Sequence, residues 1–352
     1  MTYRQPHHTG SGDSPPRRAI IIGVTGDIGC KLAAELQQRG WSVDGTYREG
    51  PAGIVPALPE DVRGWPLDLS SLDGLREGLS IDTRLEMIAE GGYDAVVYAA
   101  GMDIAAPFSM PVQKEAGLEE RLLAAYNVNL VMADLALRRM VATLETPQGP
   151  RPVVNKGAGL MLLGSAASEG NPFNSSYAAA KRGMHGLVRS VFLEQPHLED
   201  WPYRLVLAEF PYVDLGMGHK ALRWYGKMAP WVVDKVKQQG YIMQPEQLIA
   251  GLADVLESGD FPVTMLPQGF TTADLHAVTM IDQIPRRLGP ISLDWLREGL
   301  VRAYDRWPIR QVGQWAIGSL MYGLMGKSHH LPATSLKKGR PAGSNGNGKS
   351  AT

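Results

Sequence analysis

The sequence predicts an α/β fold in which helices flank a doubly wound parallel sheet, with a helical extension towards the C-terminal end. Short apolar runs, which are typical of buried parallel strands, alternate over residues 18–215 with longer segments whose apolar residues recur at helical spacing. Such alternation predicts a parallel sheet with right-handed crossovers. The first run, Ala19–Ile22, ends in a glycine cluster that opens the first helical segment. In such sheets ligands bind at the carboxyl ends of the strands.

Each element follows from a local pattern. In the first predicted helix, Ile28–Arg39, the residues Ile28, Leu32, Ala33 and Leu36 lie at helical spacing and form one apolar face. Two longer helices are expected over Leu118–Leu144 and Ser176–Leu193. Apolar runs predict further strands at Trp41–Tyr47, Trp65–Leu67, Ala95–Ala99, Gly159–Leu163, Arg204–Phe210 and Phe261–Leu266.

The chain divides into one main domain, an extension and two tails. Residues 1–17 and 328–352 are polar and rich in Gly, Ser and Pro, which predicts disorder. Residues 18–270 form the predicted main domain, with a lid at about residues 216–240. Residues 271–327 form the predicted helical extension, whose amphipathic character favours packing on the domain or on a second subunit over lying on a membrane surface.

Composition limits the possible partners. The formal net charge of −1 gives no overall attraction to nucleic acid or to an anionic membrane. The single cysteine, Cys30, excludes an internal disulfide, and metal-ligand spacings of Cys and His are absent. The longest apolar stretch near the end, Trp315–Met325, is shorter than the ~20 residues of a membrane span. We therefore expect a cytoplasmic protein without metal, nucleic-acid partner or membrane span.

A glycine-rich turn follows the first strand, in the segment Ile22–Gly29. Glycines permit a tight turn there and allow backbone N–H groups to approach a pyrophosphate at the positive end of the next helix. Glycines also serve ordinary turns. The strand, turn and helix in succession favour a nucleotide-binding site over an ordinary turn.

From this turn onward the sequence resembles the short-chain dehydrogenase/reductase family, which has a Rossmann-like fold and binds nicotinamide dinucleotides. Its motif Thr-Gly-x-x-x-Gly-x-Gly is matched at Gly23, Ile28 and Gly29. Thr25 falls where a serine or threonine of the family often contacts phosphate.

Asp27 departs from that motif, because it stands at the middle glycine, and Ile22 replaces the threonine. Spaced instead as Gly-x-x-Gly-x-x-Gly, with Gly26 in the middle, the turn resembles the atypical branch of the family. A carboxylate beside a pyrophosphate is repulsive unless it points to solvent. We expect Asp27 to cap the helix that begins at Ile28, and weakened cofactor binding is the alternative.

Arg48 follows the second strand, where NAD enzymes usually carry an acid that binds the ribose hydroxyls. A guanidinium can bind the 2′-phosphate of NADP through two parallel hydrogen bonds. The alternative is a solvated surface arginine, and Glu49 beside it weakens the signal. We therefore expect NADP(H) to be favoured over NAD(H).

The resemblance implies further cofactor contacts after the third, fourth and sixth strands. The residues are Asp68, Leu69, Ala100, Gly101, Pro211 and Val213. Some neighbouring positions depart from the family. Tyr98 and Ala99 replace two asparagines, while Tyr212 and Leu215 stand at or near the places of a glycine and a threonine.

Tyr177 and Lys181 are four residues apart, so on a helix their side chains share a face. A nearby ammonium favours the phenolate of a tyrosine, which can then exchange a proton with a substrate oxygen. Such pairs are common by chance. Ser165, twelve residues before Tyr177, resembles the serine that holds the substrate oxygen, with Ser168 as a weaker candidate. Asn129 resembles the asparagine that holds a water of the proton relay.

The resemblance implies hydride transfer between a nicotinamide and a carbonyl carbon, with Tyr177 as acid and base and Lys181 also holding the nicotinamide ribose. It therefore predicts an NADP-dependent ketoreductase or alcohol dehydrogenase, working as a homo-oligomer on a small or medium organic molecule. Trp224, Tyr225 and Met228 in the lid either line a pocket for a bulky apolar substrate or form ordinary core.

Two other functions compete with this prediction. Asp27, Tyr98, Ala99 and Leu215 favour a catalytically silent dinucleotide-binding protein, although such a protein has no chemical need for Tyr177. An epimerase or dehydratase of the extended branch fits the length and the alternative glycine spacing. A recognisable C-terminal substrate domain, which such enzymes usually add, is missing.

Overall fold

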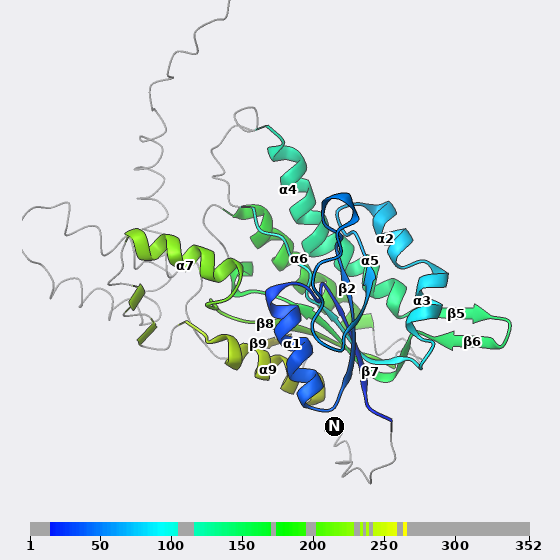
Figure 1. Cartoon of the computed structure of the whole chain (residues 1–352). Helices are drawn as coiled ribbons and strands as arrows, with labels where there is room; N and C mark the ends of the chain where they lie inside the picture. Colours follow the sequence, from blue (N-terminus) through cyan, green and yellow to red (C-terminus); the bar gives the residue numbers. More distant parts are fainter. Residues whose placement is uncertain are drawn as a thin grey trace, which may run out of the picture.

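The structure is a computed structural model (Figure 1), and its described residues are 15–104, 116–169, 174–194, 202–228, 233–234, 237–238, 242–258 and 263–265. The predicted helical extension, the C-terminal tail and most of the N-terminal tail lie outside these ranges, as does part of the predicted lid.

Seven parallel strands form one sheet in the order β3-β2-β1-β4-β7-β8-β9. The strands are β1 (Arg18–Ile22), β2 (Ser42–Tyr47), β3 (Arg63–Pro66), β4 (Tyr93–Tyr98), β7 (Val154–Leu163), β8 (Arg204–Glu209) and β9 (Val263–Met265). The order runs outward in one direction from β1 and in the other from β4, which confirms the doubly wound sheet. The direction reverses between β1 and β4, and a ligand crevice is expected at their carboxyl ends.

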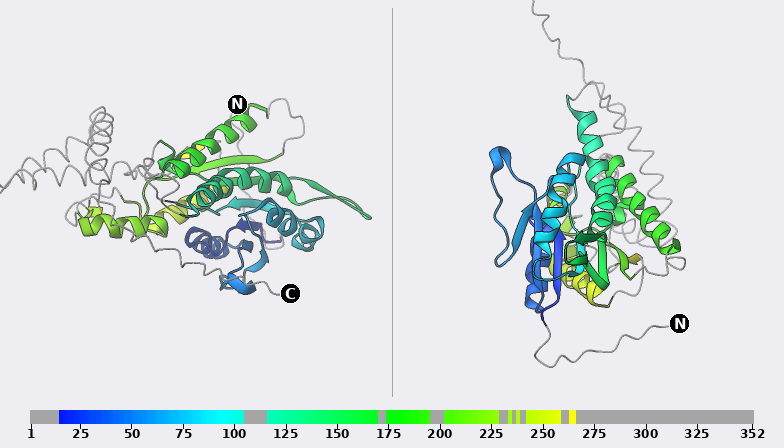
Figure 2. Two further views of the ribbon diagram at one scale, coloured as in Figure 1. Left: turned by 90° about the horizontal axis from the view of Figure 1, so that it is seen from above. Right: turned by 90° about the vertical axis from the view of Figure 1, so that its right-hand side faces the viewer.

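Helices cover both faces of the sheet (Figures 1 and 2). The structure contains helices α1 (Asp27–Gln38), α2 (Leu72–Gly78), α3 (Ile81–Met87), α4 (Leu118–Tyr126), α5 (Met132–Met140), α6 (Ser175–Glu194), α7 (Met217–Met228) and α9 (Pro245–Ser258), of which α7 extends away from the sheet (Figure 1). Within the described ranges, no helix combines the length and the apolar character needed to cross a membrane.

The sheet has one hydrophobic core on each of its two faces, and alternate residues of the same strand belong to the two cores. In β1, Ile20 and Ile22 belong to the core that contains residues of α5 and α6, while Ala19 and Ile21 belong to the core that contains residues of α1 and α9. All four side chains are fully buried. A strand buried on both faces has no polar side, which is why its sequence is a continuous apolar run.

The long helix predicted over Leu118–Leu144 is wrong in two respects. A π-helical turn, Asn127–Val131, separates α4 from α5, and the helix ends at Met140. A hairpin follows, formed by β5 (Thr143–Thr146) and β6 (Gly149–Pro152), and it projects from the body of the molecule (Figures 1 and 2). Leu144 fits the apolar spacing of the predicted helix, but in the structure it lies in strand β5 and is buried there.

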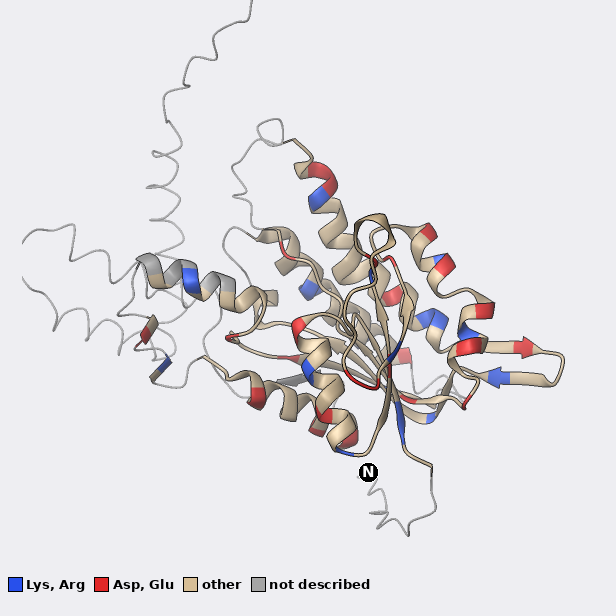
Figure 3. Cartoon of the chain, viewed as in Figure 1, with Lys and Arg blue, Asp and Glu red and all other residues tan. Residues whose placement is uncertain are grey.

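The two short helices α2 and α3 escaped prediction because they lack a long apolar pattern. Each begins at a serine whose hydroxyl accepts a hydrogen bond from a backbone N–H of the first turn, Ser71 from Gly74 and Ser80 from Thr83. These caps satisfy donors that a helix start leaves free. Figure 3 shows that charges of both signs are interspersed over the helices and the hairpin.

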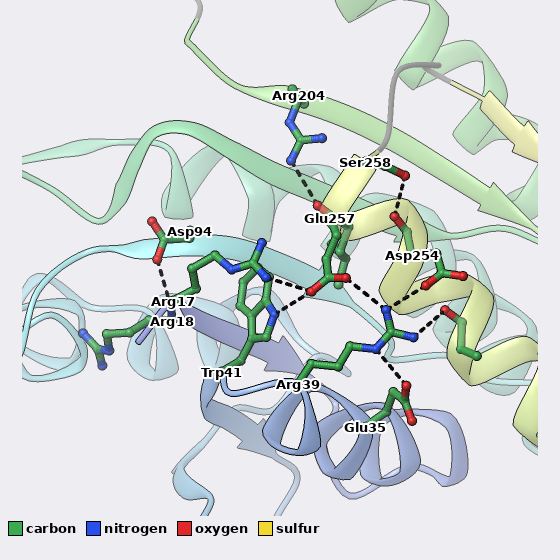
Figure 4. A network of polar contacts seen from close by, with 12 residues as sticks. Arg17, Arg18, Glu35, Arg39, Trp41, Asp94, Arg204, Asp254, Glu257 and Ser258 are labelled. Atoms are coloured by element: carbon green, nitrogen blue, oxygen red, sulfur yellow. Dashed lines mark hydrogen bonds and ion pairs between the residues drawn. The ribbon is translucent and has the colours of Figure 1, made fainter. Parts of the chain in front are cut away.

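A polar network fastens α9 to the start of the sheet (Figure 4). Arg39, just after α1, contacts Asp254 at 2.7 Å and Glu257 at 3.0 Å. Glu257 also accepts hydrogen bonds from Trp41 and Arg17, and the Arg17 guanidinium stacks 4.2 Å from the centre of the Trp41 ring. Arg17, which the sequence had assigned to the N-terminal tail, thus contacts the folded domain.

A second polar cluster lies inside the sheet. Asp44 on β2 is buried and forms an ion pair with the buried guanidinium of Arg18 at 2.7 Å. The same carboxylate accepts hydrogen bonds from the Tyr93 hydroxyl at 2.7 Å and from Arg63 at 3.2 Å. Because Asp44 and Arg18 are shielded from water, removing either partner leaves a buried charge uncompensated.

We expect Asp44→Ala to lower the free energy of unfolding by about 3 to 5 kcal/mol, because it strands the Arg18 guanidinium. The matched control is Asp134→Ala on α5, whose carboxylate pairs with Arg138 at 2.8 Å on the surface. That change should cost under about 1 kcal/mol. Urea denaturation of both variants gives the two values, and equal losses would contradict the cluster's role.

Candidate active site

The turn after β1 lies against the end of β4 at the point where the strand order reverses. Gly23 has φ +90°, and a Cβ at this position would lie 2.8 Å from the backbone nitrogen of Ala100. A Cβ at Gly29 would lie 2.4 Å from the Gly23 carbonyl oxygen. The N–H groups of Gly23 and Val24 both donate to the Thr46 carbonyl, at 3.1 and 3.0 Å. Glycine is therefore required at both positions, because a side chain would collide with the neighbouring backbone.

The first turn of α1 has no side-chain cap. The helix begins at Asp27 with Gly26 as its N-cap, so Asp27 does not occupy the capping position expected from the sequence. Gly26 and Asp27 are exposed, and Thr25 and Ile28 are partly buried. The Asp27 carboxylate lies against the loop after β8, since a Cβ at Gly216 would be 2.7 Å from its Oδ2. The helix dipole favours this negative charge.

Arg48 and Asp68 line one depression of about 590 Å³ beside β3. Arg48 is exposed and, among the residues that the structure describes, has no ion-pair partner. Asp68 is exposed, and its carboxylate accepts hydrogen bonds from the N–H and the hydroxyl of Ser70, at 2.8 and 2.9 Å. Leu69 is buried. Carboxylates share the lining, those of Glu49, Asp68, Glu77 and Glu86, so Arg48 stands in acidic surroundings.

The structure brings Ser165, Tyr177 and Lys181 together. Ser165 directly follows Gly164 at the end of β7, and its hydroxyl is hydrogen-bonded to the side chain of Tyr177. Lys181 is buried, its Nζ donates to the Leu163 carbonyl at 2.7 Å, and it lies 5.5 Å from the centre of the Tyr177 ring. The first two turns of α6 thus face the carboxyl end of β7.

The ionisation of this group differs from the sequence expectation that Lys181 would favour the Tyr177 phenolate. Burial raises the pKa of Tyr177 to about 12; the hydrogen bond with Ser165 opposes this rise, and the nearby Asp103 carboxylate adds to it. Burial also lowers the pKa of Lys181 to about 8. The phenol therefore keeps its proton at neutral pH, because desolvation outweighs the effect of its neighbours.

Asp103 is a site residue that the sequence analysis missed. It lies in the loop after β4, two residues beyond Gly101, and accepts a hydrogen bond from the buried amide of Asn174, three residues before Tyr177. The polar residue after a strand's carboxyl end is the signal that could have identified it, since ligands gather there.

Asn129 lies in the π-helical turn and is fully buried. Its amide nitrogen donates to the carbonyls of Met102 at 2.6 Å and Ala125 at 2.8 Å, and its Oδ1 accepts from the Met102 N–H at 3.2 Å. A Cβ at Gly101 would lie 3.4 Å from this Oδ1. The side chain thus fixes the loop after β4, and its oxygen keeps one further acceptor position.

Ser168, the weaker candidate for the substrate serine, has other partners. Its hydroxyl donates to Oε1 of the buried Glu209 at 3.0 Å, and His185 on α6 contacts the same oxygen at 2.6 Å. Glu209 ends β8. This cluster ties α6 to β8 and leaves Ser165 as the serine bonded to Tyr177.

The loop after β8 is held in place beside the site. Pro211 and Val213 are buried, and Val213 pairs with Met243 in an isolated bridge. Asp214 contacts His219 on α7 at 2.7 Å and Lys237 at 2.6 Å, and these neighbours lower its pKa although partial burial opposes them. Within the described ranges, no cluster of His, Cys, Asp and Glu side chains could hold a metal ion.

Comparison with known proteins identifies relatives by structure only. No family model and no curated protein matches the sequence. Thermoplasma acidophilum aldohexose dehydrogenase in ligand-free form has 17% identity and a TM-score of 0.53, covering 73% of this chain and 94% of its own. A 4-hydroxyisoleucine dehydrogenase complexed with NADH has 13% identity and a TM-score of 0.52 over 73% and 99%. An actinorhodin polyketide ketoreductase variant with NADPH has 16% identity and a TM-score of 0.54 over 72% and 96%. This chain has the fold of these enzymes.

The buried Lys181 predicts a pH-dependent stability. A lysine with a pKa of about 8 in the folded chain and 10.5 in the unfolded chain binds fewer protons when folded, so the free energy of unfolding rises with pH between these values. The gain corresponds to at most about 3 kcal/mol. We expect the wild type to gain about 2 to 3 kcal/mol over Lys181→Met between pH 7.5 and 10 in chemical denaturation. Parallel pH profiles would contradict this.

Proposed function

We propose that this chain is a divergent short-chain dehydrogenase/reductase and acts as an NADP-dependent ketoreductase or alcohol dehydrogenase. The observation that carries the proposal is the group of Ser165, Tyr177 and Lys181 at the carboxyl end of the sheet, on the side of β4 away from the glycine turn. A partly buried tyrosine bonded to a serine and packed near a lysine has the parts needed to protonate a substrate oxygen.

The residues around the crevice fit a nicotinamide dinucleotide. The turn over Gly23–Gly29 leads directly into α1, and the first turn of that helix has no side-chain cap, so its N–H groups could receive a pyrophosphate. Asp68 and Leu69 would lie beside the adenine, and Arg48 would bind the 2′-phosphate. Ala100 and Gly101 would pass beneath the cofactor, Pro211 and Val213 would border the nicotinamide, and Lys181 and Tyr177 would contact the nicotinamide ribose. When bound, the cofactor supplies or accepts the hydride.

Tyr177 is the acid in the proposed reduction of a carbonyl. Its pKa of about 12 keeps the phenol protonated at neutral pH, so it can donate that proton to the substrate oxygen. Ser165 would hold the same oxygen while negative charge develops on it. The Lys181 ammonium, with its Nζ fixed on the Leu163 carbonyl, would hold the ribose and stabilise the phenolate left behind. Asn129 would hold a water that returns the proton.

Three further parts of the proposal have support of different kinds. NADP preference rests on Arg48, and the structural neighbours include complexes with either NADH or NADPH. A homo-oligomer is supported by exposed apolar side chains on the adjoining helices α4 and α6, among them Leu123, Tyr126 and Leu193. A cytoplasmic location rests on the single free cysteine. The substrate would be a small or medium organic carbonyl or alcohol.

A catalytically silent dinucleotide-binding protein is the second candidate, and one observation favours it. The Asp27 carboxylate stands at the first turn of α1, where it competes with a pyrophosphate for the same positive potential. Such a protein would bind the cofactor without turnover.

Tyr177→Phe tests the catalytic assignment. Because the change removes one hydroxyl, we expect turnover of any carbonyl substrate to fall by at least about a hundredfold. The Kd for NADPH should stay within about twofold, since the ring is kept. NADPH oxidation with a panel of ketones and aldehydes measures turnover, and a variant that remains active would refute the role of Tyr177. A wild type that binds NADPH but oxidises it with no carbonyl would favour the silent protein.

Arg48→Ala tests the cofactor preference. The variant should bind NADPH at least about tenfold more weakly and NADH almost unchanged, because Arg48 would contact the 2′-phosphate alone. Fluorescence titration of the reduced cofactors gives both Kd values. The matched control is Arg76→Ala on α2, an exposed arginine paired with Asp73, which should affect neither. Equal losses for both cofactors would contradict phosphate recognition.

A further inference from the structure

Tyr98 ends β4 and is completely buried, and among the described residues its hydroxyl has one hydrogen-bond partner. It donates to the Val128 carbonyl at 2.6 Å, across to the π-helical turn between α4 and α5. Burial raises the pKa of this phenol far above its ordinary value, so the hydroxyl remains a neutral donor. A buried hydroxyl without a partner is costly, which makes this contact a strong constraint on the backbone it reaches.

The π-helical turn needs such contacts because its wider spacing displaces carbonyl groups from the ordinary helical pattern. Two carbonyls in and beside the turn receive side-chain donors: Val128 from Tyr98 and Ala125 from the Asn129 amide, at 2.8 Å. Asn129 is also bonded to both backbone groups of Met102, four residues beyond Tyr98. Tyr98 at the carboxyl end of β4 and Met102 in the loop after it therefore both hold the π-helical turn in place.

The same turn contacts the helix that carries Tyr177 and Lys181. Leu130, the fourth residue of the turn, packs against Gly183 on α6, where a Cβ would lie 2.5 Å from the Leu130 side chain. Gly183 is two residues beyond Lys181. A displacement of the turn thus moves Asn129 directly and bears on α6 through Leu130.

We propose that Tyr98 is a positioning residue of the active site, whose hydroxyl holds the π-helical turn so that Asn129 stays on Met102. This inference rests on the proposed function. Tyr98 does not touch the reacting atoms, and its effect reaches them through Asn129. It also explains why a tyrosine is compatible with this strand end, where the family resemblance predicted asparagine.

Tyr98→Phe removes the hydroxyl and keeps the ring. The chain offers a matched control in Tyr93→Phe, because Tyr93 lies on the same strand, is equally buried, and donates to the Met87 carbonyl at 3.1 Å as well as to Asp44. Tyr93 lies at the opposite end of β4 from the site. Any general effect of losing a buried tyrosine hydroxyl should appear in both variants.

The first measurement is hydrogen–deuterium exchange of the whole chain, which needs neither cofactor nor substrate. We expect Tyr98→Phe to speed exchange in residues 125–133 by about tenfold, and Tyr93→Phe to leave this segment unchanged. Equal exchange in the wild type and Tyr98→Phe would overturn the proposal, whether or not the chain proves to be an oxidoreductase. The exchange result therefore separates failure of this inference from failure of the proposed function.

The second measurement is steady-state NADPH oxidation with a carbonyl substrate. We expect kcat of Tyr98→Phe to fall about tenfold while KM and the Kd for NADPH stay within about twofold. If Tyr98 acts through Asn129, its loss should change kcat little in an Asn129→Ala background. Losses that multiply in the double variant, or a kcat loss of the same size in Tyr93→Phe, would overturn the proposal.

Discussion

The site depends on one close approach, between the turn after β1 and the loop after β4. At Gly23 the backbone has φ +90° and comes so near to Ala100 that a side chain would displace the loop. The two segments meet because β1 and β4 are neighbours in the sheet. From β1 the chain continues to β2 on one side, and from β4 it continues to β7 on the other. The crevice between them places the uncapped end of α1 beside the carboxyl end of β4. The other site groups are arranged along the strand ends that follow, on β7 and β8.

Helix α6 is fastened to those strand ends by a row of polar side chains at four-residue spacing. Tyr177 is bonded to Ser165, Lys181 to the Leu163 carbonyl, and His185 to Glu209. Burial is unfavourable for the charged forms of Tyr177 and Lys181, raising the pKa of the first and lowering that of the second. The amino ends of the strands, at the other end of the sheet, carry a different kind of polar contact. There the charged groups are paired, Asp44 with Arg18 and Arg39 with Glu257, and their role is to hold the fold together.

The positions that depart from the family pattern have physical consequences. Asp27 brings a carboxylate to the start of α1 and against the loop after β8. Tyr98 is accommodated because the π-helical turn offers the Val128 carbonyl to its hydroxyl. Asp103, which is not one of these departures but was missed by the sequence analysis, lies close to Tyr177 and joins desolvation in keeping the phenol protonated.

Local patterns in the sequence were sufficient for the parallel strands, for α1 and α6, and for the glycine turn, because hydrophobic spacing and backbone sterics act between near neighbours. The spacing of Tyr177 and Lys181 on one helix was predictable for the same reason, and the partnership of Ser165 with Tyr177 came from resemblance. The tertiary structure decided what depends on distant contacts. Desolvation by the surrounding protein set the pKa of Tyr177, and the fold brought Asp103 to it. The π-helical turn at Asn129 and the strand at Leu144 arise where contacts with Tyr98, Met102 and the core override a helical sequence pattern.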